Sequence, residues 1–300
     1  MSNRSENVSG AGVVGLRALL AAGDSDLMPG VWDALSARIV AAAGFSTGFL
    51  SGFAVAGTLL GKPDVGYLTQ TEMAEVARRV CAAAPDLDIV VDADTGYGNA
   101  ANVVRTVELW EAAGAHGMFL EDQVWPKKCG HMANKEVIAR DEWLAKLRAA
   151  RDHRHDIFLT ARTDARAAVS LDEALERGRM ARDLGVDAVF VEAPESIAEL
   201  ERIARELSGV VLVANMVEKG RTPLLTPSEL ADLGFRLIVS PLSILLTVAE
   251  SVRSAAETLM NEGTMRNNLQ NLMTFDAFTS VVGLPEHLEN ERKYASGSQS

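Results

Sequence analysis

Cysteine, aromatic residues and basic clusters are all scarce in this 300-residue chain. Its two cysteines, Cys81 and Cys129, are too few for a disulfide framework, which favours a reducing, cytoplasmic setting. The formal net charge is −12 at pH 7, aromatic residues make up 5%, and no basic patch carries interleaved aromatic side chains, so we expect no nucleic-acid partner. The apolar runs are too short to cross a bilayer, and the polar N-terminus has no apolar signal core, so we expect no membrane partner.

The chain does contain a regular alternation of apolar runs and amphipathic helical patterns. Several helical patterns end in a phrase with glycine before an apolar run, namely AAGF, AAGA, DLGV and DLGF, and a glycine there is a typical helix C-cap. The expected strands lie at 27–31, 47–51, 89–92, 117–121, 157–162, 188–192, 210–214 and 237–239. The expected helices lie at 13–22, 34–43, 71–84, 102–113, 141–151, 171–184, 197–207, 227–233 and 243–262, and one or two more follow residue 263.

Eight short apolar strands without polar alternation predict a parallel sheet whose outer face is covered by helices. Eight such units close into an α/β fold of the (β/α)8 TIM barrel type. An open doubly wound sheet is the competing architecture, but no GxGxxG motif follows the first strand. With 48% hydrophobic residues the chain can form a single barrel domain over 1–300, and we expect flexible ends at 1–12 and 294–300.

The stretch VVDADTGYG joins an apolar strand to a glycine-rich turn through two carboxylates, Asp92 and Asp94. Their period-two spacing predicts that both side chains lie on the same side of an extended chain. Two carboxylates at the end of a buried strand repel each other unless a cation lies between them, and a hard divalent ion is the natural partner. The alternative is that Asp94 only caps the turn and the following helix.

Polar groups also follow the other expected strands. Since barrel chemistry occurs at the carboxyl ends of the strands, these groups are predicted to converge on one site. Arg162 closes the apolar strand IFLTAR, and a buried arginine needs an anionic partner. That partner is either Asp164 or Glu192 from the protein, or a substrate carboxylate bound by two parallel hydrogen bonds. The groups at the strand ends are Trp32, Asp33, Ser51, Gly52, Asp92, Asp94, Glu121, Asp122, Arg162, Asp164, Glu192, Asn215, Glu218, Ser240 and Ser243.

A long loop, expected over residues 122–139, follows the fourth strand and reads EDQVWPKKCGHMANK. Loops of this length in a compact domain are typical of mobile active-site gates. Cys129 follows two lysines, Lys127 and Lys128, and precedes His131, so its thiol pKa should be depressed and Cys129 could act as a general acid or base. A zinc site, an inert surface thiol and a cysteine nucleophile are the alternatives. Zinc is disfavoured because Cys81 lies in a helical pattern without a partner.

These motifs together resemble the isocitrate lyase/phosphoenolpyruvate mutase superfamily. The phrases that carry the resemblance are, in chain order, VDADTGYGNA, LEDQVWPKKCGHM, ARTDA, VEA, ANMVEKGRTPLLT and SPLS. The PKKCGH loop is similar to the carbon–carbon lyase branch and to carboxyphosphonoenolpyruvate mutases. SGFAVAGTLLGKPDVGYLT resembles the petal-death type, with 2,3-dimethylmalate and 2-methylisocitrate lyases as near neighbours. The resemblance implies a barrel whose eighth helix is exchanged with a neighbouring subunit, in a homodimer or homotetramer.

The resemblance also implies roles for individual residues. Asp92 would bind Mg²⁺ (Mn²⁺ as a possible substitute), with Asp64, Asp94 and Glu121 holding the ion's shell largely through water. Cys129 would protonate the departing enolate, and Lys127, Gly130 and His131 belong to the same catalytic gate. The α-keto acid moiety and its carboxylate would be bound by Ser51, Gly52, Phe53, Arg162, Glu192 and Asn215.

One departure from the family pattern bears on the substrate. In 2-methylisocitrate lyases an arginine follows the PLS motif by three residues and binds a further carboxylate, whereas this chain has Leu246 there. Leucine cannot pair with a buried carboxylate, which disfavours a tricarboxylate substrate. Phe53, which replaces a small residue of some relatives, points the same way. The resemblance therefore implies a Mg²⁺-dependent carbon–carbon lyase that cleaves a 2-hydroxy dicarboxylate of the 2-alkylmalate class.

Three other functions stay open at this point. Within the same fold, the chain could be an oxaloacetate hydrolase or decarboxylase, or a carboxyvinyl-carboxyphosphonate phosphonomutase. In another class, it could be a barrel that binds a keto acid without turning it over. The four candidate metal carboxylates and the gate cysteine argue against this last, non-catalytic interpretation.

Overall fold

In the computed structural model, which describes residues 16–128 and 135–295, eight parallel strands close into a barrel in chain order. This confirms the predicted (β/α)8 TIM barrel over the open doubly wound sheet. The register of each neighbouring pair is parallel, including the closing pair of β1 and β8. The strands are β1 (Asp26–Val31), β2 (Thr47–Leu50), β3 (Asp88–Asp92), β4 (Gly117–Glu121), β5 (Phe158–Thr163), β6 (Ala188–Val191), β7 (Val211–Asn215) and β8 (Leu237–Ser240).

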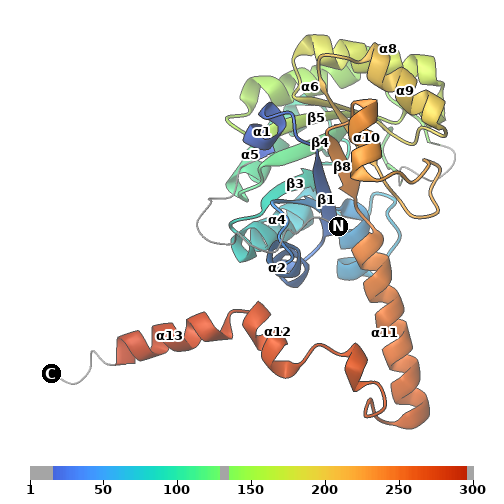
Figure 1. The fold of residues 1–300 in the computed structure, drawn as a ribbon. Helices are drawn as coiled ribbons and strands as arrows, with labels where there is room; N and C mark the ends of the chain where they lie inside the picture. Colours follow the sequence, from blue (N-terminus) through green and yellow to red (C-terminus); the bar gives the residue numbers. More distant parts are fainter. Residues whose placement is uncertain (1–15, 129–134, 296–300) are drawn as a thin grey trace.

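Helices connect the strands and cover the outside of the barrel (Figure 1). In the described residues, no helix is both long and apolar enough to cross a bilayer. The helices of the barrel are α1 (Leu16–Ala21), α2 (Ala34–Ala42), α3 (Gly52–Val55), the π-helical η1 (Ala56–Leu60), α4 (Gln70–Ala83), α5 (Ala100–Ala112), α6 (Arg140–His153), α7 (Ala165–Ala168), α8 (Leu171–Leu184), α9 (Ile197–Glu206) and α10 (Pro227–Leu233). After β8 come α11 (Ser243–Glu262), the 3₁₀ turn η2 (Leu269–Asn271), α12 (Phe275–Val281) and α13 (Leu284–Ala295).

The hydrophobic core has two parts, one on each side of the strands. The larger part fills the space between the strands and the covering helices and includes Trp110 and Trp143. The smaller part fills the inside of the barrel, where the Phe119 ring lies 4.9 Å from that of Phe49 and 5.6 Å from that of Phe190. Leu16 of α1 packs against this inner part. The barrel interior is therefore packed with side chains, so a ligand site can only lie at its mouth.

Helix α11 differs from the long helices that connect the strands because none of its residues is buried. It projects away from the barrel, and α12 and α13 continue beyond it (Figure 1). Its apolar side chains Leu246, Val252 and Leu259 are about half or more exposed. An eighth helix that does not cover its own barrel agrees with the expected exchange between subunits, which stays a prediction, as does the homodimer or homotetramer.

The predicted element bounds are confirmed for β4, α8, α10 and α11 and differ by one to three residues at most other ends. From its glycines, the segment 52–68 between the predicted strand at 47–51 and the predicted helix at 71–84 is expected to be a loop. This prediction is partly wrong, because residues 52–60 form α3 and η1. The Ser51 side chain caps α3 by accepting a hydrogen bond from the Ala54 N–H, and this cap starts a helix despite Gly52 and Gly57. Of the expected flexible ends, 1–12 and 296–300 lie outside the described residues, whereas residues 294 and 295 belong to α13.

Candidate active site

A cavity of about 210 Å³ opens at the carboxyl ends of the strands. Its floor is the inner aromatic layer of the barrel, made by Phe49, Phe119 and Phe190, so the packed core closes it from below. Most of the predicted site residues meet around this cavity. Those that line it are Ser51, Phe53, Asp64, Asp92, Lys127, Arg162, Glu192 and Asn215.

The acidic cluster at one side of the cavity contains Asp64, Asp92 and Asp94. The prediction that Asp92 and Asp94 share one side of an extended chain is wrong in its geometry, because β3 ends at Asp92 and Asp94 has a left-handed backbone with φ of 45°. The turn nevertheless keeps the two carboxyl groups near each other, since Asp92 Oδ2 and Asp94 Oδ1 both lie within 3.6 Å of the point where a Cβ of residue 52 would be. The backbone N–H of Asp94 also donates to Asp92 Oδ1 at 3.1 Å. Gly52 allows this arrangement: a Cβ at its position would lie 3.0 Å from Asp92 Oδ2.

Lys127 is the cation that lies among these carboxylates in the structure. Its Nζ atom is 2.6 Å from Asp64 Oδ1 and 2.7 Å from Asp94 Oδ1, and its side chain is buried. Burial lowers the pKa of Lys127, but the charges of the acidic cluster outweigh burial and raise it well above its ordinary value. Burial raises the pKa of Asp94 to about 7 although Lys127 opposes this. The sequence placed Lys127 in a catalytic gate; the structure shows it as a counterion of the candidate metal ligands.

Arg162 lies at the other side of the cavity, where the register of β4 and β5 places it directly beside Glu121. Its Nη1 is 3.2 Å from Glu121 Oε2, and its Nη2 is 3.7 Å from Glu192 Oε2. Asp164 binds it through two hydrogen bonds, Nε to Oδ2 at 2.9 Å and Nη2 to Oδ1 at 3.2 Å. Both protein partners expected for Arg162 are therefore present. Burial lowers its pKa, but these three carboxylates raise it well above the ordinary value.

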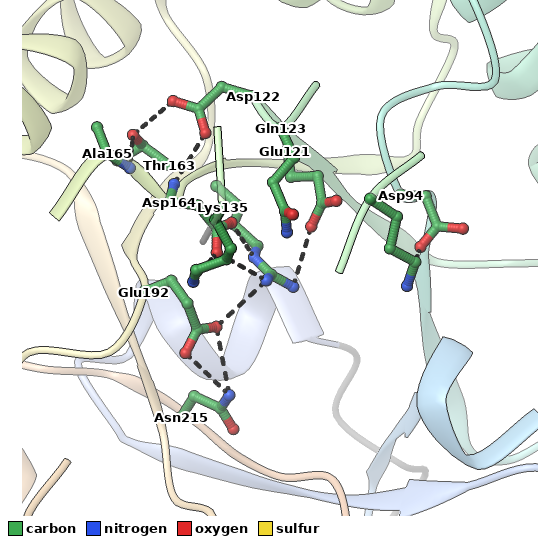
Figure 2. Close-up of polar contacts among 12 residues, drawn as sticks. Asp94, Glu121, Asp122, Gln123, Lys135, Thr163, Asp164, Ala165, Glu192 and Asn215 are labelled. Atoms are coloured by element: carbon green, nitrogen blue, oxygen red, sulfur yellow. Dashed lines mark hydrogen bonds and ion pairs between the residues drawn. The ribbon is translucent and has the colours of Figure 1, made fainter. Parts of the chain in front are cut away.

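A second layer of charged groups holds Asp164 in place (Figure 2). Lys135 donates to Asp164 Oδ1 at 2.5 Å, and the Asp164 N–H donates to Asp122 Oδ1 at 2.8 Å. Asp122 Oδ2 in turn accepts hydrogen bonds from Thr163 and from Arg177 at 2.6 and 3.0 Å. The sequence analysis missed Lys135 and Arg177, because a lysine in a loop and an arginine in a charged helix have no signal that separates them from surface residues.

The opposite wall carries Glu192 and Asn215 from the ends of β6 and β7. The Asn215 amide donates to both Glu192 oxygens at 3.4 Å, which orients the two side chains toward the cavity (Figure 2). Of the remaining lining residues, Val217, Val239, Pro241 and Leu242 are apolar and Lys128 is charged. Leu246, expected to bound the substrate pocket, is 46% exposed on α11 and is not among the cavity residues. The apolar wall at the start of α11 is therefore made by Leu242.

Carboxylates outnumber cations in this buried site. Asp64, Asp92, Asp94, Glu121, Asp122, Asp164 and Glu192 are all buried, against the buried cations Lys127, Lys135, Arg162 and Arg177. Seven acids and four bases leave an excess of three negative charges if every group is ionised, and the half-buried Lys128 of the cavity wall reduces this excess to two. Accordingly, burial raises the pKa of Glu121 well above its ordinary value despite Arg162, and burial raises that of Asp122 to about 6. The site therefore has a deficit of positive charge.

The gate residues Cys129, Gly130 and His131 lie outside the described residues, but both flanks of their segment are described. Before it, the Gln123 side chain donates to and accepts from the Lys128 backbone at 2.8 and 2.9 Å. At the base of the 122–139 loop, the N–H of Val124 donates to the Glu136 carbonyl and that of Ile138 to the Asp122 carbonyl. These bonds tie both described flanks to residues 122–124, which directly follow β4.

Comparison with known proteins agrees with this architecture. The sequence model of the family described as phosphoenolpyruvate phosphomutase matches residues 16–260. The chain belongs to the phosphoenolpyruvate mutase/isocitrate lyase superfamily. It is therefore an enzyme of the superfamily's lyase and mutase group, and the recognition made from its motifs is confirmed.

Three relatives with mutase, lyase or other names are similar to this chain over most of its length. The carboxyvinyl-carboxyphosphonate phosphorylmutase of Arabidopsis thaliana is 50% identical, over 90% of this chain and 81% of that protein. The petal death protein of Dianthus caryophyllus is 45% identical, over 90% and 85%. The 2,3-dimethylmalate lyase of Eubacterium barkeri is 40% identical, over 94% and 98%. Relatives of both the mutase and the lyase kind thus match nearly the whole chain.

Two solved structures show the same fold. An oxaloacetate acetylhydrolase in complex with 3,3-difluorooxalacetate superposes with a TM-score of 0.90 at 32% identity, covering 95% of this chain and 97% of that chain. A phosphonopyruvate hydrolase in complex with oxalate and Mg²⁺ gives a TM-score of 0.84 at 26% identity, covering 93% and 98%. Both structures share the barrel over almost their full length.

Proposed function

We propose that this protein is a Mg²⁺-dependent lyase that cleaves the carbon–carbon bond of a 2-hydroxy dicarboxylate. The observation that carries the proposal is the cavity itself, which has an excess of buried carboxylates on one side and Arg162 on the other. Its floor is apolar, and so are its remaining walls apart from Lys128. Such a site suits a small dianion that brings a metal ion with it and carries a short or apolar substituent.

A divalent cation fits the residues that are present. The site lacks positive charge, and the buried Glu121 Oε1 accepts no hydrogen bond from any residue that the structure describes. Within residues 16–128 and 135–295, no three acidic, histidine or cysteine side chains form a complete set of direct metal ligands. Mg²⁺ keeps several of its waters, so Asp92 would hold it directly and Asp64, Asp94 and Glu121 through water. When bound, it supplies Lewis-acid stabilisation of negative charge on the substrate oxygens.

The protein's own residues would orient the substrate. Arg162 binds a substrate carboxylate with the N–H groups that Asp164 does not occupy. A base in the site takes the proton of the 2-hydroxyl, the C2–C3 bond breaks, and C2 becomes the carbonyl carbon of an α-keto acid. The bonding electrons pass to C3 and its carboxylate as an enediolate, and the Cys129 thiol then donates a proton to C3. Lys127, held at the rim, keeps positive charge near the developing enediolate.

The cavity disfavours a third carboxylate on the substrate. A further carboxylate would need another buried cation, since an unpaired buried charge is costly. Among the described cavity residues the buried cations are Lys127 and Arg162, which both already lie against carboxylates, whereas Lys128 is only half-buried. A 2-alkylmalate therefore fits better than 2-methylisocitrate.

A second candidate, carboxyphosphonoenolpyruvate mutase activity, is favoured by the relative of that name at 50% identity. A product assay separates the two. The protein is incubated with Mg²⁺ and, separately, 2,3-dimethylmalate, other 2-alkylmalates, oxaloacetate, 2-methylisocitrate and a carboxyphosphonoenolpyruvate. Keto acid release from the alkylmalates supports the lyase. The lyase proposal would be refuted if a carbon–phosphorus bond forms, if the only reaction seen is release of oxalate from oxaloacetate, or if no substrate is turned over.

The proton-transfer step has its own test. Replacing Cys129 by serine should lower kcat by two orders of magnitude or more, of the size general acid catalysis contributes (roughly 10²–10⁴-fold), and leave Mg²⁺ affinity unchanged. Cys81→Ser, at a half-buried position of α4, is the matched control and should keep full activity. A fully active Cys129→Ser variant would show that the thiol is not the proton donor.

A further inference from the structure

The second layer behind Arg162 contains a lysine whose charge bears on substrate binding. Asp164 occupies the Nε and Nη2 edge of Arg162 with hydrogen bonds of 2.9 and 3.2 Å, which orients the guanidinium and leaves Nη1 toward Glu121 and the cavity. This contact has a cost, however. A carboxylate in direct contact cancels the positive charge that an anionic substrate would need.

Lys135 opposes this cancellation. Its Nζ atom lies 2.5 Å from Asp164 Oδ1, the same oxygen that accepts from Arg162 Nη2, and both side chains are buried. Burial alone would raise the pKa of Asp164, but Arg162 and Lys135 together hold it below the ordinary value, so Asp164 is ionised. The trio of Asp164, Arg162 and Lys135 then carries one net positive charge, which faces Glu121 and Glu192, whereas the Asp164–Arg162 pair alone would carry none.

We propose that Lys135 is a positioning residue that keeps the charge of Arg162 available for the substrate carboxylate by neutralising Asp164. Lys135 does not line the cavity, so it acts through Asp164 and Arg162 rather than by touching the substrate. Asp164 itself is fixed from behind, since its N–H donates to Asp122, and Asp122 accepts from Thr163 (Figure 2). Arg177 also donates to Asp122. This inference rests on one part of the proposed function, namely that Arg162 binds a carboxylate of the substrate.

The test measures binding of oxalate, a dianion, by calorimetry in saturating Mg²⁺, so it needs no turnover. Lys135→Met should weaken oxalate binding roughly 10- to 100-fold, the range seen when outer-layer partners of a binding group are removed. Mg²⁺ affinity measured without oxalate should stay within about threefold. Lys135→Arg, which keeps the charge, should bind oxalate nearly as well as the wild-type protein. Lys219→Met, which removes an exposed lysine on the β7–α10 loop, controls for net charge.

The deciding variant is the double substitution Lys135→Met with Asp164→Asn. With both charges removed, the positive charge of Arg162 is no longer offset by Asp164. Oxalate affinity should therefore recover by at least about tenfold over Lys135→Met alone. A purely structural role of Lys135 predicts no such recovery. If Lys135→Met does not fold, Lys135→Gln, which keeps a donor for Asp164 but no charge, replaces it in the same comparison.

The inference is overturned if Lys135→Met binds oxalate like the wild-type protein, or if the double variant binds no better than the single one. These results are independent of the lyase proposal. Absence of carbon–carbon cleavage with an intact Lys135 effect on oxalate would refute the proposed reaction and leave the role of Lys135 standing. Cleavage activity combined with no effect of Lys135→Met on oxalate binding would support the proposed reaction and refute the role of Lys135.

Discussion

Replacing Lys127 by methionine should make the stability of the protein depend strongly on Mg²⁺. The Lys127 ammonium lies 2.6 and 2.7 Å from oxygens of Asp64 and Asp94. At such distances the attraction is about 6 kcal/mol per pair for an effective dielectric constant near 20, and desolvation offsets much of it. Removing one partner of a buried ion pair typically costs about 3–5 kcal/mol, and uptake of a proton by Asp94, whose pKa is about 7, relieves part of this.

The assay is thermal unfolding of both proteins in EDTA and in saturating Mg²⁺. At about 2 °C per kcal/mol for a chain of this size, the variant should unfold roughly 6–10 °C below the wild-type protein in EDTA. In Mg²⁺ at least half of this gap should close, because the bound cation neutralises the carboxylates that Lys127 has left, and binding to the native state stabilises it.

Lys146→Met is the matched control for this experiment. Lys146 is also buried, but its Nζ atom donates to the carbonyl of Thr95 at 3.1 Å and forms no ion pair with the acidic cluster among the described contacts. Its loss should lower the unfolding temperature equally with and without Mg²⁺. If Lys127→Met also shows the same gap under both conditions, Lys127 and the metal ion do not share the same carboxylates and the reasoning fails.

Two further predictions concern the acidic cluster. Folding raises the pKa of Asp94 from 3.8 to about 7, so the native state of the metal-free protein holds this proton between those pH values and loses stability as pH rises through them. Between pH ~4 and pH ~7, the free energy of unfolding measured with urea in EDTA should fall less steeply for Asp94→Asn than for the wild-type protein. Identical slopes would contradict the raised pKa of Asp94. Gly52→Ala would place a Cβ 3.0 Å from Asp92 Oδ2 and 3.6 Å from Asp94 Oδ1. It should weaken Mg²⁺ binding at least roughly tenfold by calorimetry with little change in unfolding temperature, and an unchanged affinity would refute the crowding argument.

The barrel could be predicted from the sequence because its signals are local and repeated. Each strand is a short apolar run, and the glycines that end helices, such as Gly185 and Gly234, adopt the left-handed backbone that the predicted C-caps require. The convergence of polar groups followed from the same fold, since parallel strands all end at one face of a barrel. Asp92, Arg162 and Asn215 therefore meet around the cavity as expected from their places at strand ends.

What escaped prediction depends on contacts between distant segments. The pairing of Lys127 with Asp64 joins residues more than sixty positions apart, and nothing in either segment indicates it. The buried positions of Lys135 and Arg177 follow from the site's excess of negative charge, which only the assembled barrel reveals. The helix after Ser51 was missed because Gly52 and Gly57 suggested a loop, while the serine cap outweighed them.

The most direct test of the account is a crystal structure of the protein with Mn²⁺, whose anomalous scattering locates the ion, and oxalate. We expect one Mn²⁺ ion among Asp64, Asp92, Asp94 and Glu121, with Lys127 moved off at least one of these carboxylates, and oxalate between the ion and Arg162. An ion bound elsewhere, or oxalate that does not contact Arg162, would contradict it.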